Sequence, residues 1–362
     1  GTPPNFLNKE EIKGVLKVMV EREKYPIDFP KFIITKNFEK FFKNHYYKSK
    51  LSKNKEILFN FSDVTFCDLF ELCLITLWIN ELNDGSKEIK CKLPMDSKAY
   101  NFFEKWEFVK FLRDKSMHLE RKGIIESKEY PEYEHIQPIT FFPDNGDFDN
   151  FIKSLEDEKR QQDIFKDLYY NLDVISSGVM RDIIIAEIGE NIFTHAKGIG
   201  ALMAMGRINK PQKTMLPEFE QSFFRALGKI KGLGETGYLQ IVICDQGDGF
   251  KKVLGSTYEE DESIPIDERE NPTELKIIDY AFEKMATSKK GKPLSEIAED
   301  EDYERLIPPK GLYFVKELLK KKKGFLSVRS GSSIVCYDFL SDNKAKIYTS
   351  QDHMHLTNFG GV

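Results

Sequence analysis

Apolar residues recur with the period of a strand or of a helix in the first third of the chain. The runs 57–61 and 88–93 predict strands, and the runs 70–82 and 97–109 predict helices with broad apolar faces. Short loops separate each strand from the helix that follows it. This strand–helix–strand order predicts parallel strands, because antiparallel neighbours are usually joined by a tight hairpin.

A second group of elements follows in the C-terminal half. Helical spacing predicts helices over 182–196 and 312–320, and apolar runs predict strands over 200–205 and 238–245. A hairpin is predicted after them, over 324–339, with no further strand beyond it. Strands and helices thus occur in both groups, which predicts the α/β fold class.

The chain has 362 residues, and this length favours about two domains. We predict a first domain over 1–122, which begins with a Lys-rich helical extension. A second domain is predicted over 149–362. The segment 123–148 is rich in Pro, Gly, Tyr and acidic residues, and it is expected to connect the two domains.

The predicted helix 182–196 carries polar side chains along an otherwise apolar element. Three isoleucines at intervals of four form one stripe, while Glu187, Asn191 and His195 recur at the same interval on another face. A buried charge is costly unless something binds it. A metal-bound phosphate would meet that need, because Asn191 offers an oxygen to Mg2+ and Glu187 can polarise a water. The alternative is a solvated polar face on an amphipathic structural helix.

Two later motifs bear on that choice. The strand predicted over 238–245 ends in Asp245-x-Gly247-x-Gly249, and the sequence Pro-Lys-Gly-Leu at 309–312 opens a helix. In this order the three motifs resemble the N, G1 and G2 boxes of the GHKL ATPases. That group includes gyrase-type topoisomerases, MutL, histidine kinases and the anti-sigma serine kinases.

The resemblance covers roughly residues 150–362 and implies a Bergerat α/β sandwich, with helices on one face of a mixed sheet. It implies ATP and Mg2+ as ligands. Asp245 would accept a hydrogen bond from the adenine amino group, and Gly247 and Gly249 would let the backbone approach the base and ribose. Asn191 would bind the Mg2+, and Glu187 would be the general base toward a water or hydroxyl.

The phosphate groups are assigned to the third motif by the same resemblance. Gly311 and Leu312 begin a helix whose N–H groups favour an anion. Lys310 and Lys289 are candidate phosphate partners, and Lys289 lies in the interval that forms a mobile lid in GHKL proteins. The chain departs from the family at Pro309, where a glycine is usual, because proline has no N–H to donate.

The segment 60–68, Asn-Phe-Ser-Asp-Val-Thr-Phe-Cys-Asp, resembles the end of a strand in STAS-like domains. The phosphorylated members of that family have Ser or Thr at the next position, at the start of a helix. Here the residue is Leu69, which has no hydroxyl group. The resemblance therefore implies a scaffold or docking module rather than a phosphorylation switch.

Composition narrows the range of partners and locations. The formal net charge of −5 does not favour nucleic acid. The longest mostly apolar run, 72–79, is far shorter than the roughly 20 residues of a membrane helix. The five cysteines form no C-x-x-C pair, so reduced thiols and a cytoplasmic protein are expected. A protein partner or a homodimer is the expected macromolecular contact.

Other nucleotide motifs do not fit. A literal G-x-G-x-x-G at 232–237 precedes a strand rather than a helix, which excludes a Rossmann site, and no P-loop motif is present. Three functions stay open: a slow Mg2+-dependent ATPase that signals its nucleotide state to a partner, an anti-sigma-type serine/threonine kinase that acts on a STAS protein, and a binding-only ATP module.

Overall fold

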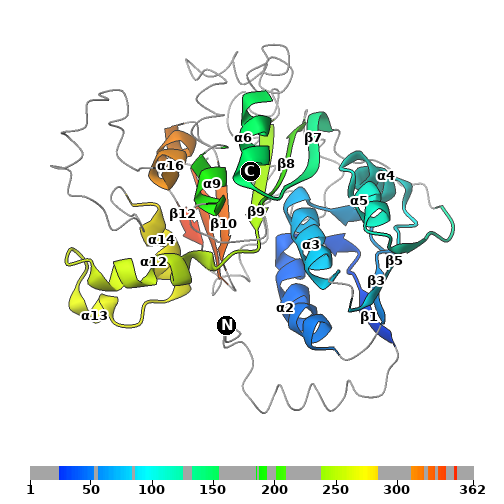
Figure 1. Ribbon diagram of the computed structural model, residues 1–362, viewed down its shortest axis with the longest axis horizontal. Coiled ribbons are helices and arrows are strands. Elements are labelled where there is room, and N and C mark those ends of the chain that lie inside the picture. Colours follow the sequence, from blue (N-terminus) through cyan, green and yellow to red (C-terminus); the bar gives the residue numbers. More distant parts are fainter. Residues whose placement is uncertain are drawn as a thin grey trace. The chain divides into compact units, whose positions relative to one another are not determined.

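The computed structural model (Figure 1) describes residues 24–52, 56–83, 86–124, 133–154, 185, 187–193, 201–208, 238–283, 311–321, 325–330, 333–339 and 346–348. These residues belong to two compact units, and each is described by itself. The first unit contains the described residues up to Thr140 and from Leu202 to Cys244, and the second contains those from Phe141 to Ala201 and from Asp245 onward. The predicted domain boundaries stay a prediction. Several predicted features lie outside the described residues: His195, Lys289, Pro309, Lys310 and most of the expected lid.

A four-stranded parallel sheet forms the centre of the first unit (Figure 1). Its order is β1-β3-β5-β6, and every pair is parallel, as the strand–helix order predicts. The strands are β1 (Lys24–Asp28), β3 (Glu56–Asn60), β5 (Glu88–Lys92) and β6 (His118–Glu120). The outer strands β1 and β6 were not predicted, because a charged residue or a proline interrupts the apolar run in each.

The two faces of this sheet differ in chemistry because side chains alternate along each strand. One face is apolar and fully buried, and Phe59 on this face lies 5.1 Å from Trp78 between ring centroids. The other face carries ion pairs across neighbouring strands, in which Glu56 contacts both Lys24 and Lys90. The core of the unit therefore lies on the helix-bearing face of the sheet.

The helices of this unit begin and end at identifiable signals. They are α2 (Thr35–Leu51), α3 (Leu69–Leu82), α4 (Ser97–Lys105) and α5 (Phe108–Asp114). The carboxylate of Asp68 caps α3 by accepting from the Phe70 N–H at 3.0 Å, and Asp96 caps α4 in the same way. One prediction was wrong: the run 97–109 is not a single helix. It breaks at Trp106 and Glu107, where Trp106 is fully buried and Glu107 has a left-handed backbone with φ of 57°.

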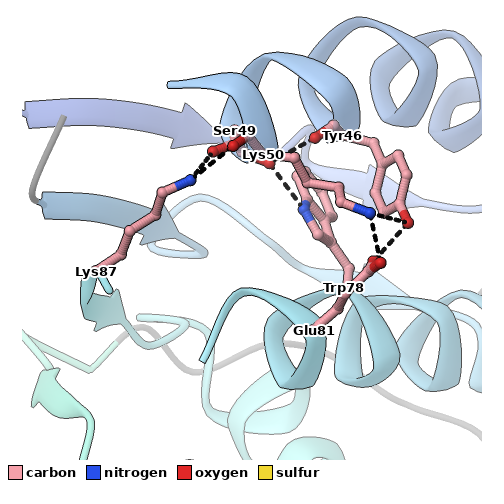
Figure 2. Close-up of polar contacts among 6 residues, drawn as sticks. All are labelled: Tyr46, Ser49, Lys50, Trp78, Glu81 and Lys87. Carbon is pink, nitrogen blue, oxygen red and sulfur yellow. Dashed lines mark hydrogen bonds and ion pairs between the residues drawn. The ribbon is translucent and has the colours of Figure 1, made fainter. Parts of the chain in front are cut away.

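Polar contacts fix the C-terminal end of α2 against its neighbours (Figure 2). The Lys87 ammonium donates to the backbone carbonyls of Ser49 and Lys50 at 2.7 and 2.9 Å. The Trp78 indole N–H donates to the Ser49 hydroxyl at 3.0 Å, and Lys50 forms an ion pair with Glu81. Helix carbonyls at this end have no intrahelical donor, so a lysine there satisfies them and complements the helix dipole.

A three-stranded sheet of order β7-β8-β9 lies almost wholly in the first unit. Its strands are β7 (Tyr133–Phe142), β8 (Ala201–Ile208) and β9 (Tyr238–Asp245). The segment 123–148, predicted to be a connector, thus contains a ten-residue strand, and its Ile139 N–H donates to the Trp106 carbonyl at 3.2 Å. In β9, the Gln240 amide donates to the Asp68 carboxylate at 3.3 Å and is only 1% exposed.

The second unit is built on an antiparallel sheet with helices. The predicted hairpin is confirmed as β10 (Phe325–Ser330) and β11 (Ser333–Asp338), and the helix predicted over 312–320 is confirmed as α16 (Gly311–Lys321). A further helix, α14 (Glu274–Ala281), packs on this sheet. The expectation of no further strand was wrong, because β12 (Lys346–Tyr348) pairs with β11. The sequence did not predict β12 because a three-residue strand is too short to show an alternation of apolar and polar residues. The remaining helices are α6 (Asn145–Ser154), α9 (Glu187–Asn191), α12 (Gly249–Glu260) and α13 (Ile266–Arg269).

The core of this unit lies between α12, α14 and the sheet. Ile277 and Ile278 of α14 are fully buried, and they pack with Phe282 and with Tyr337 of β11. The Tyr337 hydroxyl donates to the Asp279 carboxylate at 2.5 Å, which satisfies its polar end inside the core. None of the helices in the described part of the chain is both long and apolar enough to cross a lipid bilayer.

We expect Lys87→Met to destabilise the first unit by about 1–2 kcal/mol, because two carbonyls at the end of α2 lose a charged donor while the apolar stem is kept. Urea unfolding measures this change. Lys110→Met is the matched control, since Lys110 is exposed and pairs only along its own helix with Glu107. Equal midpoints for the two variants would show that Lys87 does not stabilise α2.

Candidate functional site

The turn that follows β9 contains the predicted Asp245, Gly247 and Gly249. The Asp245 carboxylate accepts a hydrogen bond from the Gly247 N–H at 2.5 Å, which closes the chain into a tight turn. Gly249 has φ of 74°, in the left-handed region that favours glycine, and it is the first residue of α12. Local geometry therefore explains the residue types at Asp245 and Gly249.

Burial gives Asp245 unusual electrostatics. Desolvation raises the pKa of its carboxyl above the ordinary value, and the hydrogen bond from Gly247 lowers the pKa by a smaller amount. Among the residues that the structure describes, no Lys, Arg or His forms an ion pair with Asp245. A carboxylate with a single backbone donor retains capacity to accept further hydrogen bonds.

Two side chains from distant segments reach the start of α12. The Ser330 hydroxyl, at the end of β10, accepts from the Phe250 N–H at 2.9 Å. The Glu274 carboxylate, at the start of α14, accepts from the Lys251 N–H at 3.2 Å and also from the Ser330 hydroxyl. A Cβ at Gly249 would lie 2.9 Å from the Ser330 oxygen, so only glycine fits beside this pair.

Helix α9 carries the predicted Glu187 and Asn191 one turn apart, as the sequence spacing requires. The Asn191 side-chain NH2 donates to the Glu187 backbone carbonyl at 2.7 Å. Because a carbonyl only accepts, this contact assigns the nitrogen of the Asn191 amide. Its oxygen, Oδ1, accepts no hydrogen bond from any residue in the described ranges, and both side chains are partly exposed.

The position of α9 depends on a close aromatic contact. The ring of Phe148, from α6, is 1% exposed and packs directly over Gly189, between Glu187 and Asn191. A Cβ at Gly189 would lie 2.1 Å from that ring. The glycine in the middle of the motif is therefore required by packing, and the ring fixes the helix that carries both polar residues.

Helix α16 begins at Gly311, where the third motif predicts a helix start. It lies against α9 and against β10, with Val315 fully buried. The three motifs are therefore linked in one unit: α9 contacts α16, α16 contacts β10, and Ser330 of β10 bonds to the start of α12. Lys289 and Lys310 stay predictions outside the described residues.

Sequence reasoning missed Ser330, Glu274 and α12 itself. The apolar residues of α12, at Phe250, Val253, Leu254 and Tyr258, have helical spacing and could have revealed it. No comparable signal marks the other two. Glu274 looks like an ordinary acidic residue in a first helical turn, and Ser330 like a residue before a hairpin turn.

Two oxygen-bearing side chains in this unit, those of Asn191 and Asp245, have chemistry that suits a nucleotide with its metal. Asn191 Oδ1 is the oxygen ligand type that Mg2+ prefers, and Asp245 can accept from an amino group. Within the described ranges, no cluster of three His, Cys, Asp or Glu could hold a metal by itself. Mg2+ in nucleotide sites commonly needs only one or two protein ligands beside the phosphates, so a single Asn oxygen fits this mode.

We expect Gly189→Ala to lower the free energy of unfolding by about 1–3 kcal/mol, because the added methyl overlaps the buried Phe148 ring. Gly255→Ala is the matched control in α12, since its Cβ would meet only the Lys251 stem, at 3.9 Å. Alanine there should be neutral or stabilising, through helix propensity. Thermal unfolding compares the pair, and an equal Tm would contradict the contact.

Comparison with family models, with curated proteins and with solved structures gives no match for this chain.

Proposed function

We propose that the second unit binds ATP with Mg2+ in a GHKL-type site, hydrolyses it slowly and couples its nucleotide state to a partner protein. As in the sequence-based prediction, the proposal assigns the Bergerat fold to residues 149–362, which include β8 and β9 as well as the elements of this unit. The observation that carries it is the Asp245 carboxylate, which is partly buried, has a single backbone donor and leads into a glycine turn. Such a group has a stability cost that a ligand donor would offset.

Adenine supplies a donor of the required kind. Its exocyclic amino group would donate to Asp245, whereas guanine presents a carbonyl oxygen at the equivalent position. A carboxylate therefore favours ATP over GTP, because a carbonyl facing an anionic acceptor leaves both groups unsatisfied. The Gly247 N–H already holds one carboxylate oxygen, which fixes the orientation of the group.

The phosphate end is assigned to α9 and α16. The start of α12 is less suited to phosphate, since the Glu274 carboxylate already occupies its Lys251 N–H and would repel a second anion. The start of α16, at Gly311 and Leu312, is the helix end that the third motif assigns to phosphate. Asn191 would hold the Mg2+ through Oδ1, and bound Mg2+ would neutralise charge on the triphosphate. Glu187, one turn away, would take a proton from the attacking water.

The first unit is proposed to be a STAS-like docking module. Its strands are parallel, and α3 begins directly after Asp68, in the place that the resemblance gives to the phosphorylated helix. Leu69 is 0% exposed and belongs to the core, so packing requires an apolar residue at this position. A buried leucine in place of a hydroxyl supports a binding role over a phosphorylation switch.

Asp245→Asn should weaken ATP binding by about 1.5–3 kcal/mol, roughly ten- to a hundredfold in Kd, because the amide loses the charge-assisted acceptor. Isothermal calorimetry measures this change. The ligand-free variant should be as stable as the parent at neutral pH or more stable. Burial raises the pKa of Asp245, so its ionised form costs more in the folded than in the unfolded chain.

The free-energy cost of ionised Asp245 in the folded chain depends on pH, and this dependence provides a control. It is present above the raised pKa and disappears below the ordinary aspartate value of about 3.9, where both states are protonated. The difference in stability between the variant and the parent should therefore shrink as the pH falls through that window. Unchanged ATP affinity in the variant would exclude Asp245 as the adenine contact.

Glu187→Ala should retain ATP and lose turnover by about 10²–10⁴-fold, since Glu187 acts on the nucleophile and not on the metal. Asn191→Ala should lose Mg2+-dependent binding and turnover together. Phosphate release and ATP affinity, measured with and without Mg2+, separate the two variants. Parental turnover in Glu187→Ala would remove its catalytic role, and label transfer from γ-labelled ATP to an added STAS protein would favour the kinase function.

A further inference from the structure

We propose that Ser330 and Glu274 are positioning residues for the ATP site: they hold the turn from Asp245 to Gly249 in its binding conformation, although neither touches the nucleotide. This inference rests on the proposed function. It assigns control of nucleotide affinity to two side chains outside all three motifs. Glu274 lies 29 residues beyond Asp245 in the sequence, and Ser330 lies 85 residues beyond it.

The hydrogen bonds form a closed set around the start of α12. The Phe250 N–H donates to the Ser330 hydroxyl, the Ser330 hydroxyl donates to Glu274, and the Lys251 N–H donates to the same Glu274 oxygen, Oε1. Ser330 is only 5% exposed. Two N–H groups that a helix leaves without an intrahelical partner are therefore satisfied by tertiary contacts.

The local sequence does not supply this cap. Asp248 stands directly before α12, at the usual capping position, but its side chain caps no N–H group and pairs with Lys252 instead. Gly249 follows in a left-handed conformation, and glycine has a large conformational entropy to lose. The side chains that accept from the Phe250 and Lys251 N–H groups are therefore Ser330 and Glu274, which come from other segments of the chain.

Holding the turn matters for affinity because a ligand binds only the competent fraction of the protein. If the turn samples other conformations, the apparent Kd rises in proportion to the lost fraction. The Asp245 carboxylate is bonded to the Gly247 N–H, so movement of the glycine turn also moves the adenine acceptor. Ser330 and Glu274 thus act on the base through the backbone.

The same pair connects the turn to the phosphate end. Ser330 ends β10, which lies against α16, and Glu274 begins α14, which packs on β10 and β11. A change in the packing of α16 against β10 therefore has a short route to the adenine turn. This route consists of the Ser330 hydroxyl and the Glu274 carboxylate, which are hydrogen-bonded to each other.

The test compares the full chain with Ser330→Ala, Glu274→Ala and Glu274→Gln. Two readouts are combined: the Kd for ATP with Mg2+, and hydrogen–deuterium exchange of peptides covering residues 245–256. Ser263→Ala and Glu268→Gln are matched controls, because the Ser263 hydroxyl bonds to Asp261 and Glu268 pairs with Lys276, away from the turn.

We expect Ser330→Ala and Glu274→Ala to raise the Kd for ATP about tenfold and to speed exchange at the start of α12. Added ATP should restore protection in these variants more than in the parent, which a purely structural defect would not do. Glu274→Gln keeps an oxygen that accepts from both donors, so its Kd should stay within about threefold of the parent value.

The outcomes separate the two proposals. A parent chain that does not bind ATP overturns the proposed function and this inference with it. A parent chain that binds ATP, together with unchanged Kd and exchange in Ser330→Ala and Glu274→Ala, overturns the positioning role alone. Equal losses in Glu274→Gln and Glu274→Ala would likewise contradict a role for the hydrogen-bond acceptor.

Discussion

A carboxylate that is partly withdrawn from water needs donors to replace the lost water, and each unit of this protein meets that constraint at an aspartate beside a helix start. Asp68 precedes α3 and Asp245 precedes α12, and burial raises the pKa of both carboxyl groups. Each accepts an N–H from the residue two positions later, Phe70 or Gly247. The difference between them lies in what else reaches the carboxylate.

In the first unit the protein itself supplies the second donor. The buried Gln240 amide, from β9, bonds to Asp68, and the neighbouring Leu69 closes the position with apolar packing. No comparable donor reaches Asp245 from the described residues. One aspartate is thus satisfied as a structural joint between α3 and β9, while the other keeps acceptor capacity for a ligand. The two carboxylates therefore differ in how many of their acceptor positions the described part of the protein fills.

Periodicity predicted the elements whose apolar positions repeat without interruption, such as α3, α16 and the β10–β11 hairpin. It failed where few residues carry the pattern, as in β12, or where a proline interrupts it, as in β1. The single helix predicted over 97–109 was wrong because the tertiary burial of Trp106 sets the break, and no local breaker residue marks it.

The candidate site divides in the same way. The positions of Glu187, Asn191, Asp245 and the glycines were predicted, because each belongs to a short motif whose spacing is visible in the sequence, and their part in a nucleotide site stays a proposal. Ser330 and Glu274 were not, because their role depends on β10 and α14 folding back onto the start of α12. Hydrogen bonds between segments so far apart leave no spacing rule in one sequence.

Side chains of the second unit satisfy the free N–H groups at the starts of two of its helices, α12 and α14. A helix N-terminus attracts anions, and a protein that binds a triphosphate at one such end gains by neutralising the others. Glu274 satisfies α12 with a carboxylate, and the Thr273 hydroxyl caps α14 by accepting from the Lys276 N–H at 3.3 Å. Both ends are closed by side chains of the protein. The Glu274 carboxylate would repel an anion at α12, and in the proposed ATP site this repulsion favours phosphate binding at the start of α16 instead.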